Sequence, residues 1–115
     1  MIENYIYFIR CGRDGPIKIG TAAQPKRRLI DLQISHWQKL SIIATIKGTP
    51  KQEKEWHERF RGFKIRGEWF WPVPSLLKRI EEATEFEKKV GDKAPYTSPL
   101  REFLGMPPKS IKEIS

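Results

Sequence analysis

The chain has 115 residues, of which 38% are hydrophobic and 31% charged, with a formal net charge of +8 and a single cysteine, Cys11. A chain of this length folds as one small domain with a single core, and this composition is typical of a soluble globular protein with a highly charged surface. One cysteine excludes an internal disulfide, and no apolar run approaches the roughly 18 to 20 residues that a transmembrane helix needs.

The positive charge predicts an anionic partner. Nucleic acid is the first candidate and an acidic membrane surface the second, because both present dense negative charge. Near Glu3 we find no basic region followed by a long apolar run, so we expect no signal peptide and a cytoplasmic location.

The first elements read as a β-hairpin. Tyr5 to Ile9 alternates aromatic and β-branched residues, which predicts a half-buried strand. Arg13 to Pro16 carries the residues of a turn. Ile17 to Ile19 alternates again and predicts a second strand, with Lys18 on the opposite face from the two isoleucines. We expect Gly20 to end this strand.

A helix is expected from Lys26 to Ser35, with Leu29 and Leu32 on its inward face. Arg27 and Arg28 are adjacent and point about 100° apart, so we expect only one of them to face the hairpin. Arg28 lies beside the core-facing Leu29, which places it at the margin of the buried face. For Arg27 we favour the interpretation as a solvated charge or one that binds a backbone phosphate.

Tyr7, Lys18 and Arg28 could converge on one patch of this hairpin and helix. A tyrosine, a lysine and an arginine together would suit the binding of a phosphate diester. The alternative is that Tyr7 is a core aromatic residue with its hydroxyl at the rim, and that Lys18 and Arg28 are solvated.

Trp37 follows the first helix and either covers the core or forms an exposed platform for stacking on a base; we favour the core because an aromatic side chain usually buries its apolar area. Leu40 to Ile46 predicts a third strand. Thr49 is the expected N-cap of the next helix, and Pro50 suits the first helical position.

The second helix, from about Lys51 to Arg61, places Glu53 and His57 on the same face as Trp56 and Phe60. Since the two aromatic residues are expected in the core, Glu53 should lie at the edge of the buried face and need a partner or a metal ion. The alternative is that Glu53 only interacts with the positive end of the helix dipole.

His57 either forms a hydrogen bond at the core edge or holds Glu53 or a substrate phosphate. The Glu53–His57 spacing could suit zinc, but we find no third ligand with convincing spacing, so we do not expect a zinc site.

Basic and aromatic residues alternate after the second helix. Lys64 and Arg66 should share one face, which could contact nucleic acid. We expect Glu68 to form an ion pair with an arginine, and Trp69 and Phe70 to close the core over the second helix.

A third helix is expected from Pro74 to about Lys89, ending at Gly91. It carries several glutamates, so its exposed face should not bind nucleic acid. We therefore predict one domain over residues 1–91 and a tail over residues 92–115, weakly ordered or docked, that could bind a protein partner.

Four separate motifs resemble those of the GIY-YIG nuclease superfamily. Ile6-Tyr7 matches the end of the first motif, and Lys18 to Gly20 matches the second, with lysine where that motif usually has tyrosine. Arg28 matches the arginine of the family's helix. Glu53 to Phe60 and Arg66 to Phe70 look like later motifs of the branch of phage T5 orf172-type and meiotically up-regulated gene 113-type proteins.

This resemblance covers roughly Tyr5 to Pro72 and implies a fold class and an activity. The fold is α+β, with a small three-stranded antiparallel sheet flanked by about three helices. The activity is metal-dependent hydrolysis of phosphodiester bonds in DNA, with DNA a better expectation than RNA. The alternatives are a nucleic-acid-binding module with little or no catalysis, and an interaction protein that uses its tail.

The resemblance also implies roles for individual residues. Tyr7 would deprotonate or orient the attacking water, Arg28 would stabilise charge on the phosphate, and Glu53 would hold one Mg²⁺ or Mn²⁺ ion. Lys18 would supply charge in place of the second tyrosine, or act as the base if it is desolvated beside Arg28. We include His57 among the catalytic residues. The expected nucleic-acid-binding residues are Lys26, Arg27, Lys64 and Arg66.

Overall fold

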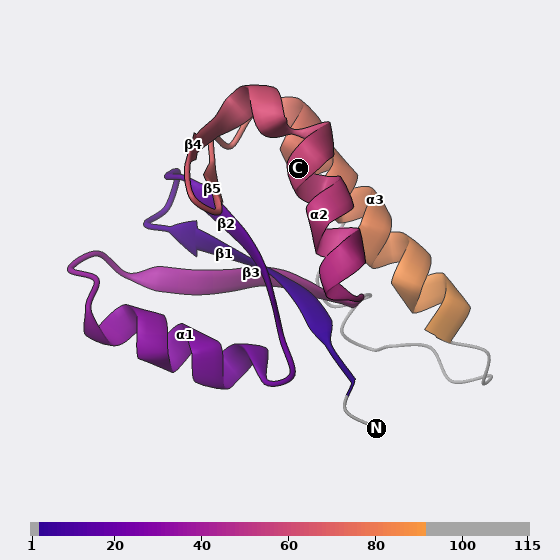
Figure 1. The fold of residues 1–115 in the computed structure, drawn as a ribbon, viewed down its shortest axis with the longest axis horizontal. Coiled ribbons are helices and arrows are strands. Elements are labelled where there is room, and N and C mark those ends of the chain that lie inside the picture. Colours follow the sequence, from indigo (N-terminus) through magenta and orange to yellow (C-terminus); the bar gives the residue numbers. More distant parts are fainter. Residues whose placement is uncertain (1–2, 92–115) are drawn as a thin grey trace.

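The computed structural model describes residues 3–91. This part of the chain forms an antiparallel sheet with α1 on one face and α2 and α3 packed side by side on the other (Figure 1). The predicted tail, residues 92–115, lies outside the described range. In chain order the elements are β1 (Tyr5–Cys11), β2 (Ile17–Ala22), α1 (Pro25–Ile34), β3 (Leu40–Lys47), α2 (Pro50–Arg59), a 3-10 turn (Arg61–Phe63), β4 (Lys64–Arg66), β5 (Trp69–Phe70) and α3 (Pro74–Gly91).

The sheet has the strand order β3-β1-β2-β5-β4, and all its neighbours are antiparallel. The α+β class and the three helices are confirmed, but the expected sheet of three strands is wrong because the described residues form five. The two additional strands, β4 and β5, form a short hairpin whose turn contains Gly67 at a φ of 57°. Glycine adopts this left-handed conformation without steric cost.

β1 is an interior strand, paired with β3 on one side and β2 on the other, and it is buried on both faces. Ile6 and Phe8 point into the core beneath α2 and α3, whereas Tyr7 and Ile9 point into the smaller core beneath α1. The expectation of a half-buried strand is therefore wrong, because helices cover both sides of the sheet. This placement puts Tyr7 inside the molecule, not on its surface.

β2 continues to Ala22, so the expectation that Gly20 ends the strand is wrong. Gly20 pairs with Tyr7 across the sheet. A Cβ atom at this position would collide with the hydroxyl of Tyr7 and lie 2.5 Å from its Cζ atom. The glycine is needed because the tyrosine ring occupies the space that a side chain would take.

Replacing Gly20 with alanine is expected to destabilise the protein by about 1–3 kcal/mol, because a buried ring must shift to admit the methyl group. The free energy of unfolding from chemical denaturation measures this loss. Gly62→Ala is the matched control, since a Cβ atom at Gly62 meets nothing within 4 Å. Equal effects of the two substitutions would contradict the steric role of Gly20.

The helices follow the local signals of the sequence. Thr49 caps α2 as predicted, in a capping box in which Thr49 and Gln52 exchange hydrogen bonds with each other's backbone, and Pro50 occupies the first turn. Phe60 is buried as expected, and Trp56 packs on the same core with its ring 4.8 Å from that of Phe8. None of the helices between residues 3 and 91 is long and apolar enough to cross a membrane.

Two predictions for tryptophans are wrong. Trp69 packs on the α1 side of the sheet, beside Tyr7 and Ile9, because it neighbours Phe70 on β5 and successive strand residues point to opposite faces. Phe70 does lie in the core beneath α2, as predicted. Trp37 does not cover the core but is 89% exposed.

Candidate functional site

The predicted site residues meet at the edge of β2 where its pairing with β5 ends. β5 pairs with β2 at Ile17 and Lys18. At the next residue, the N–H of Ile19 donates to the carbonyl of Glu68 at 2.9 Å, and the Ile19 carbonyl lies 2.9 Å from Nε2 of His57. α2 and the turn between β4 and β5 therefore border this edge of the strand.

Glu53 in the first turn of α2 points toward β2. Its side chain is only 14% exposed, and its Oε1 atom accepts a hydrogen bond of 2.9 Å from the hydroxyl of Thr21. Burial raises the pKa of Glu53 above its ordinary value, and the negative charge of Glu68 adds to this, whereas Thr21 and His57 lower it. Thr21 and His57 thus hold the Glu53 carboxylate in a fixed position. An interaction with the helix dipole alone would not require these two contacts.

His57 holds Glu53 and the edge of β2 at once. Its Nε2 atom lies 2.9 Å from the Ile19 carbonyl and 3.2 Å from Oε2 of Glu53. Since both neighbours are oxygen acceptors, we assign the ring proton to Nε2. The ring also packs edge-on against Phe70, with centroids 5.0 Å apart. With this assignment the Nε2 atom donates to these oxygens and is not free to bind a metal ion.

Glu68 is the site residue that the sequence did not reveal. It forms an ion pair with Lys18, with Nζ and Oε1 2.9 Å apart, so the expected pairing with an arginine is wrong. Glu68 follows Gly67 in the β4–β5 turn, and this hairpin was not part of the predicted sheet. Lys18 lies against Trp69, 5.8 Å from the ring centroid, and is therefore held by Glu68 and Trp69, not placed alone beside Arg28.

Glu53, His57 and Glu68 each bring one potential ligand atom within 4.8 Å of the others. Because Nε2 of His57 donates to a carbonyl, the donors available to a metal are the two carboxylates. Two partly buried carboxylates this close repel each other, and a divalent cation would relieve that repulsion. Oxygen donors of this kind fit Mg²⁺ or Mn²⁺.

Tyr7 reaches the same site from inside the sheet. Tyr7 is 1% exposed, and the space above Gly20 is bordered by its hydroxyl and by Oε1 of Glu68. Burial, followed by the charge of Glu68, raises the pKa of Tyr7 above 10.0, and the positive charge of Arg28 acts against this. The hydroxyl therefore stays protonated at neutral pH.

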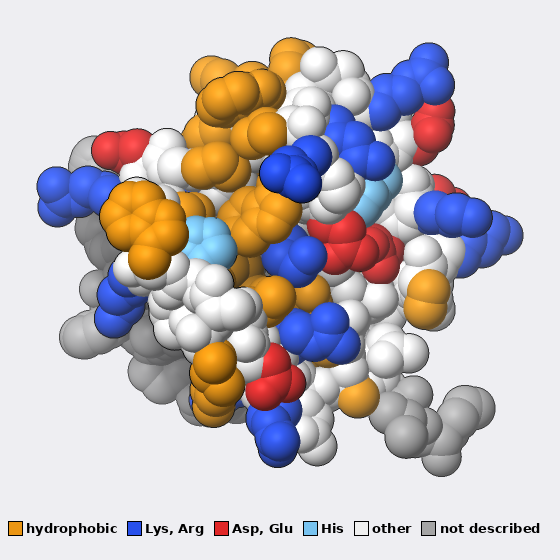
Figure 2. Space-filling view, turned by 60° about the vertical axis from the view of Figure 1, so that its left-hand side comes forward, with side chains coloured by type: hydrophobic (Ala, Val, Ile, Leu, Met, Phe, Trp, Pro, Cys, Tyr) orange, Lys and Arg blue, Asp and Glu red, His pale blue; other side chains and the backbone are white. Residues whose placement is uncertain are grey.

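The structure thus brings Tyr7, Lys18, Arg28, Glu53 and His57 together at one edge of β2. Figure 2 shows acidic side chains and a histidine side by side on one face, with Lys and Arg side chains around them.

The four residues predicted to bind nucleic acid do not join this cluster and lie exposed on α1 and β4. Arg27 is 3.6 Å from Asp31 one turn along α1, as expected for a solvated charge. The exposed residues are Lys26, Arg27, Lys64 and Arg66.

Glu53 and His57 line a shallow hollow of about 460 Å³, together with Pro50, Lys51 and Lys54. Its wall contains two lysines, so an anion entering the hollow would meet positive charge beside the carboxylate of Glu53.

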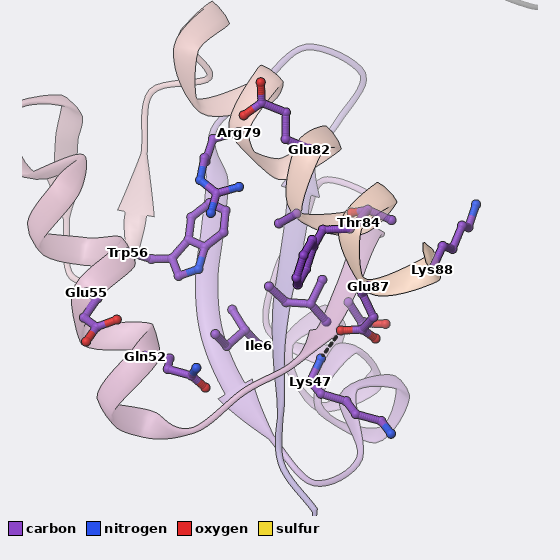
Figure 3. A pocket seen from close by; sticks show the side chains of 14 residues that line it. Ile6, Lys47, Gln52, Glu55, Trp56, Arg79, Glu82, Thr84, Glu87 and Lys88 are labelled. Carbon is purple, nitrogen blue, oxygen red and sulfur yellow. Dashed lines mark hydrogen bonds between the residues drawn. The ribbon is translucent and has the colours of Figure 1, made fainter. Parts of the chain in front are cut away.

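A larger groove of about 1060 Å³ lies between α2 and α3 and is lined by a different face of α2 (Figure 3). Arg79 lies over Trp56 there, 5.3 Å from the ring centroid, and the backbone N–H of Lys47 donates to Glu87 at 2.7 Å. This groove holds none of the predicted catalytic residues, and charges of both signs line it, so its size does not make it the functional site.

Comparison with known proteins gives one match. The model of the family described as the T5orf172 domain matches residues 4–114. No curated protein and no solved structure matches the chain.

Proposed function

The chain belongs to the T5orf172 domain family, a family of nuclease-like, DNA-binding domains, and from this premise we propose that it is a metal-dependent endonuclease of the GIY-YIG superfamily that hydrolyses phosphodiester bonds in DNA. The observation that supports the proposal most is the gathering of Tyr7, Arg28, Glu53 and Glu68 beside the edge of β2 where its pairing with β5 ends. A scaffold used only for binding would not need two partly buried carboxylates close together where phosphates approach.

In this proposal Glu53 and Glu68 hold one Mg²⁺ or Mn²⁺ ion, and His57 and Thr21 fix the orientation of Glu53. Such an ion, when bound, would stabilise the negative charge that develops during phosphodiester hydrolysis.

Arg28 stabilises the charge that develops on the phosphate, because a guanidinium can bind two phosphate oxygens at once. Tyr7 keeps its proton, since burial raises its pKa, so we assign it the orientation of the attacking water and not its deprotonation. Lys18 supplies positive charge beside Glu68 in place of a second tyrosine.

The exposed Lys26, Arg27, Lys64 and Arg66 would bind the DNA backbone on either side of the site. Such contacts displace counterions, so affinity should fall steeply with salt concentration. We propose DNA over RNA as the substrate, in keeping with the family.

The second candidate function is DNA binding with little catalysis. The Lys18–Glu68 ion pair favours this second function. The ammonium group of Lys18 already neutralises the Glu68 carboxylate, so a metal ion would have to compete with it.

A cleavage assay on supercoiled plasmid separates the two functions. With Mg²⁺ or Mn²⁺ we expect conversion to the nicked or linear form, and with EDTA we expect intact plasmid. Gel-shift binding is measured on the same preparations. Binding without cleavage under either metal ion would contradict the nuclease and support the binding module.

A further inference from the structure

The loop between α1 and β3 presents Trp37 to solvent on a backbone that the protein holds in place. Trp37 is 89% exposed. The amide nitrogen of Gln33 donates to the carbonyls of His36, at 3.1 Å, and Gln38, at 2.8 Å, while its Oε1 atom accepts from the N–H of Leu40 at 2.8 Å. The side chain of Gln33 therefore holds both ends of the loop together.

The β1–β2 turn holds the same loop from the other side. The N–H of Gly12 donates to the carbonyl of Lys39 at 2.8 Å, and the thiol of Cys11 donates to Oε1 of Gln38 at 2.7 Å. The large exposed indole is thus carried by a fixed loop, and holding its flanking backbone reduces the conformational entropy lost when a ligand stacks on it.

The rings of His36 and Trp69 form a short row that leads from the Trp37 loop toward the candidate site. Trp37 follows His36 directly, and the His36 ring lies 6.0 Å from the Trp69 ring at an angle of 32°. Trp69 in turn contacts Lys18, which pairs with Glu68. Figure 2 shows the corresponding pattern on one face, with orange and pale blue side chains that continue into blue and red ones.

We propose that Trp37, together with the neighbouring row of His36 and Trp69, forms a stacking surface for unpaired bases, so that the substrate class is DNA with a single-stranded segment next to the cut. Bases within a duplex already stack on one another, whereas an unpaired base can place its face on an exposed indole. Surfaces that bind single-stranded nucleic acid combine aromatic side chains with positive charge, and the net charge of +8 complements such a strand.

A protein partner is the competing occupant, because Ile30 and Ile34 of α1 are also 58% and 80% exposed. We favour nucleic acid because the row leads to charged residues of the candidate site and not into an apolar groove. The inference rests on the proposed function for its substrate, but its binding test does not depend on cleavage.

The test measures fluorescence anisotropy in EDTA with three labelled DNA probes: a single strand, a blunt duplex, and the same duplex with a single-stranded flap. Trp37→Ala is expected to weaken binding of the single strand and the flap about 5- to 100-fold and to leave blunt duplex binding unchanged. Trp37→Phe should retain most of the affinity, since a ring remains. Ile34→Ala, an exposed apolar neighbour without a ring, is the control and should change nothing.

An equal loss on all three probes, or no loss on any, would overturn the stacking surface. A change of oligomeric state in both Trp37→Ala and Ile34→Ala, with DNA affinity intact, would also overturn it and identify a protein contact. Flap binding that depends on Trp37 in a protein that never cleaves would support this inference while contradicting the nuclease. Metal-dependent cleavage together with flap binding that does not depend on Trp37 would support the nuclease and contradict the stacking surface. A protein that binds none of the probes would refute both proposals.

Discussion

Replacing Glu53 with glutamine is expected to lower metal-dependent cleavage by about 10³-fold or more, while binding in EDTA is unchanged or slightly stronger. Glutamine keeps the shape of the side chain and an oxygen that can accept from Thr21. It removes the charge that a metal ion needs, and it also removes repulsion toward phosphates. Plasmid cleavage and anisotropy on the same variant measure the two effects.

A second readout follows metal binding without catalysis. Mn²⁺ should raise the melting temperature of the wild-type protein, because a ligand that binds only the folded state stabilises it, and this shift should disappear in Glu53→Gln. Glu55→Gln is the matched control, since Glu55 lies on the same helix but lines the groove toward α3. Cleavage that survives in Glu53→Gln and is lost in Glu55→Gln would show that Glu55, and not Glu53, holds the metal ion.

Replacing Arg28 with alanine is expected to reduce the rate of cleavage at saturating enzyme by about 10²- to 10³-fold. The positive charge of Arg28 lowers the pKa of Tyr7, so we propose that this charge also faces the phosphate that gains negative charge. Single-turnover kinetics isolate this effect from binding. The melting temperature should change little, because Arg28 is exposed on α1.

Arg27 offers a control of the same residue type on the same helix. It is exposed and lies 3.6 Å from Asp31, and we place it on the DNA backbone. Arg27→Ala should weaken binding uniformly and reduce the salt dependence by about one counterion, with the single-turnover rate at saturation unchanged. Equal rate losses in the two variants would show that Arg28 contributes only general positive charge.

The elements with local signals could be predicted from the sequence. Alternating residues identified β1 and β2, and the helical spacing of Glu53 and His57 correctly placed both on one face of α2. The Thr49 cap and Pro50 fixed where that helix begins. In each case the evidence lies within a few residues of the element itself.

Features that depend on distant contacts could not be predicted in the same way. β4 and β5 have three and two residues, too few for a periodic pattern, and the place of Glu68 in the site depends on the turn between them. Gly20 was expected to end a strand. Its actual role is to leave space for the Tyr7 ring on the neighbouring strand, and that contact cannot be read from the residues around Gly20.

The exposure of Trp37 was missed for a related reason. An aromatic residue usually buries its area, but the core beneath α1 is formed by other residues, among them Leu32, Leu40 and Trp69. The hydrogen bonds by which Gln33 fixes the loop have no local signature in the residues around it.

The interior position of β1 in the sheet has a consequence for how the site responds to thermal fluctuation. β1 is hydrogen-bonded to a neighbour on each side and covered by helices on both faces. Its amide hydrogens should therefore exchange with solvent only when the whole domain opens, and not through fraying of one edge. Tyr7 lies on this strand. Its position in the site should therefore be kept during local openings and be lost only on global unfolding.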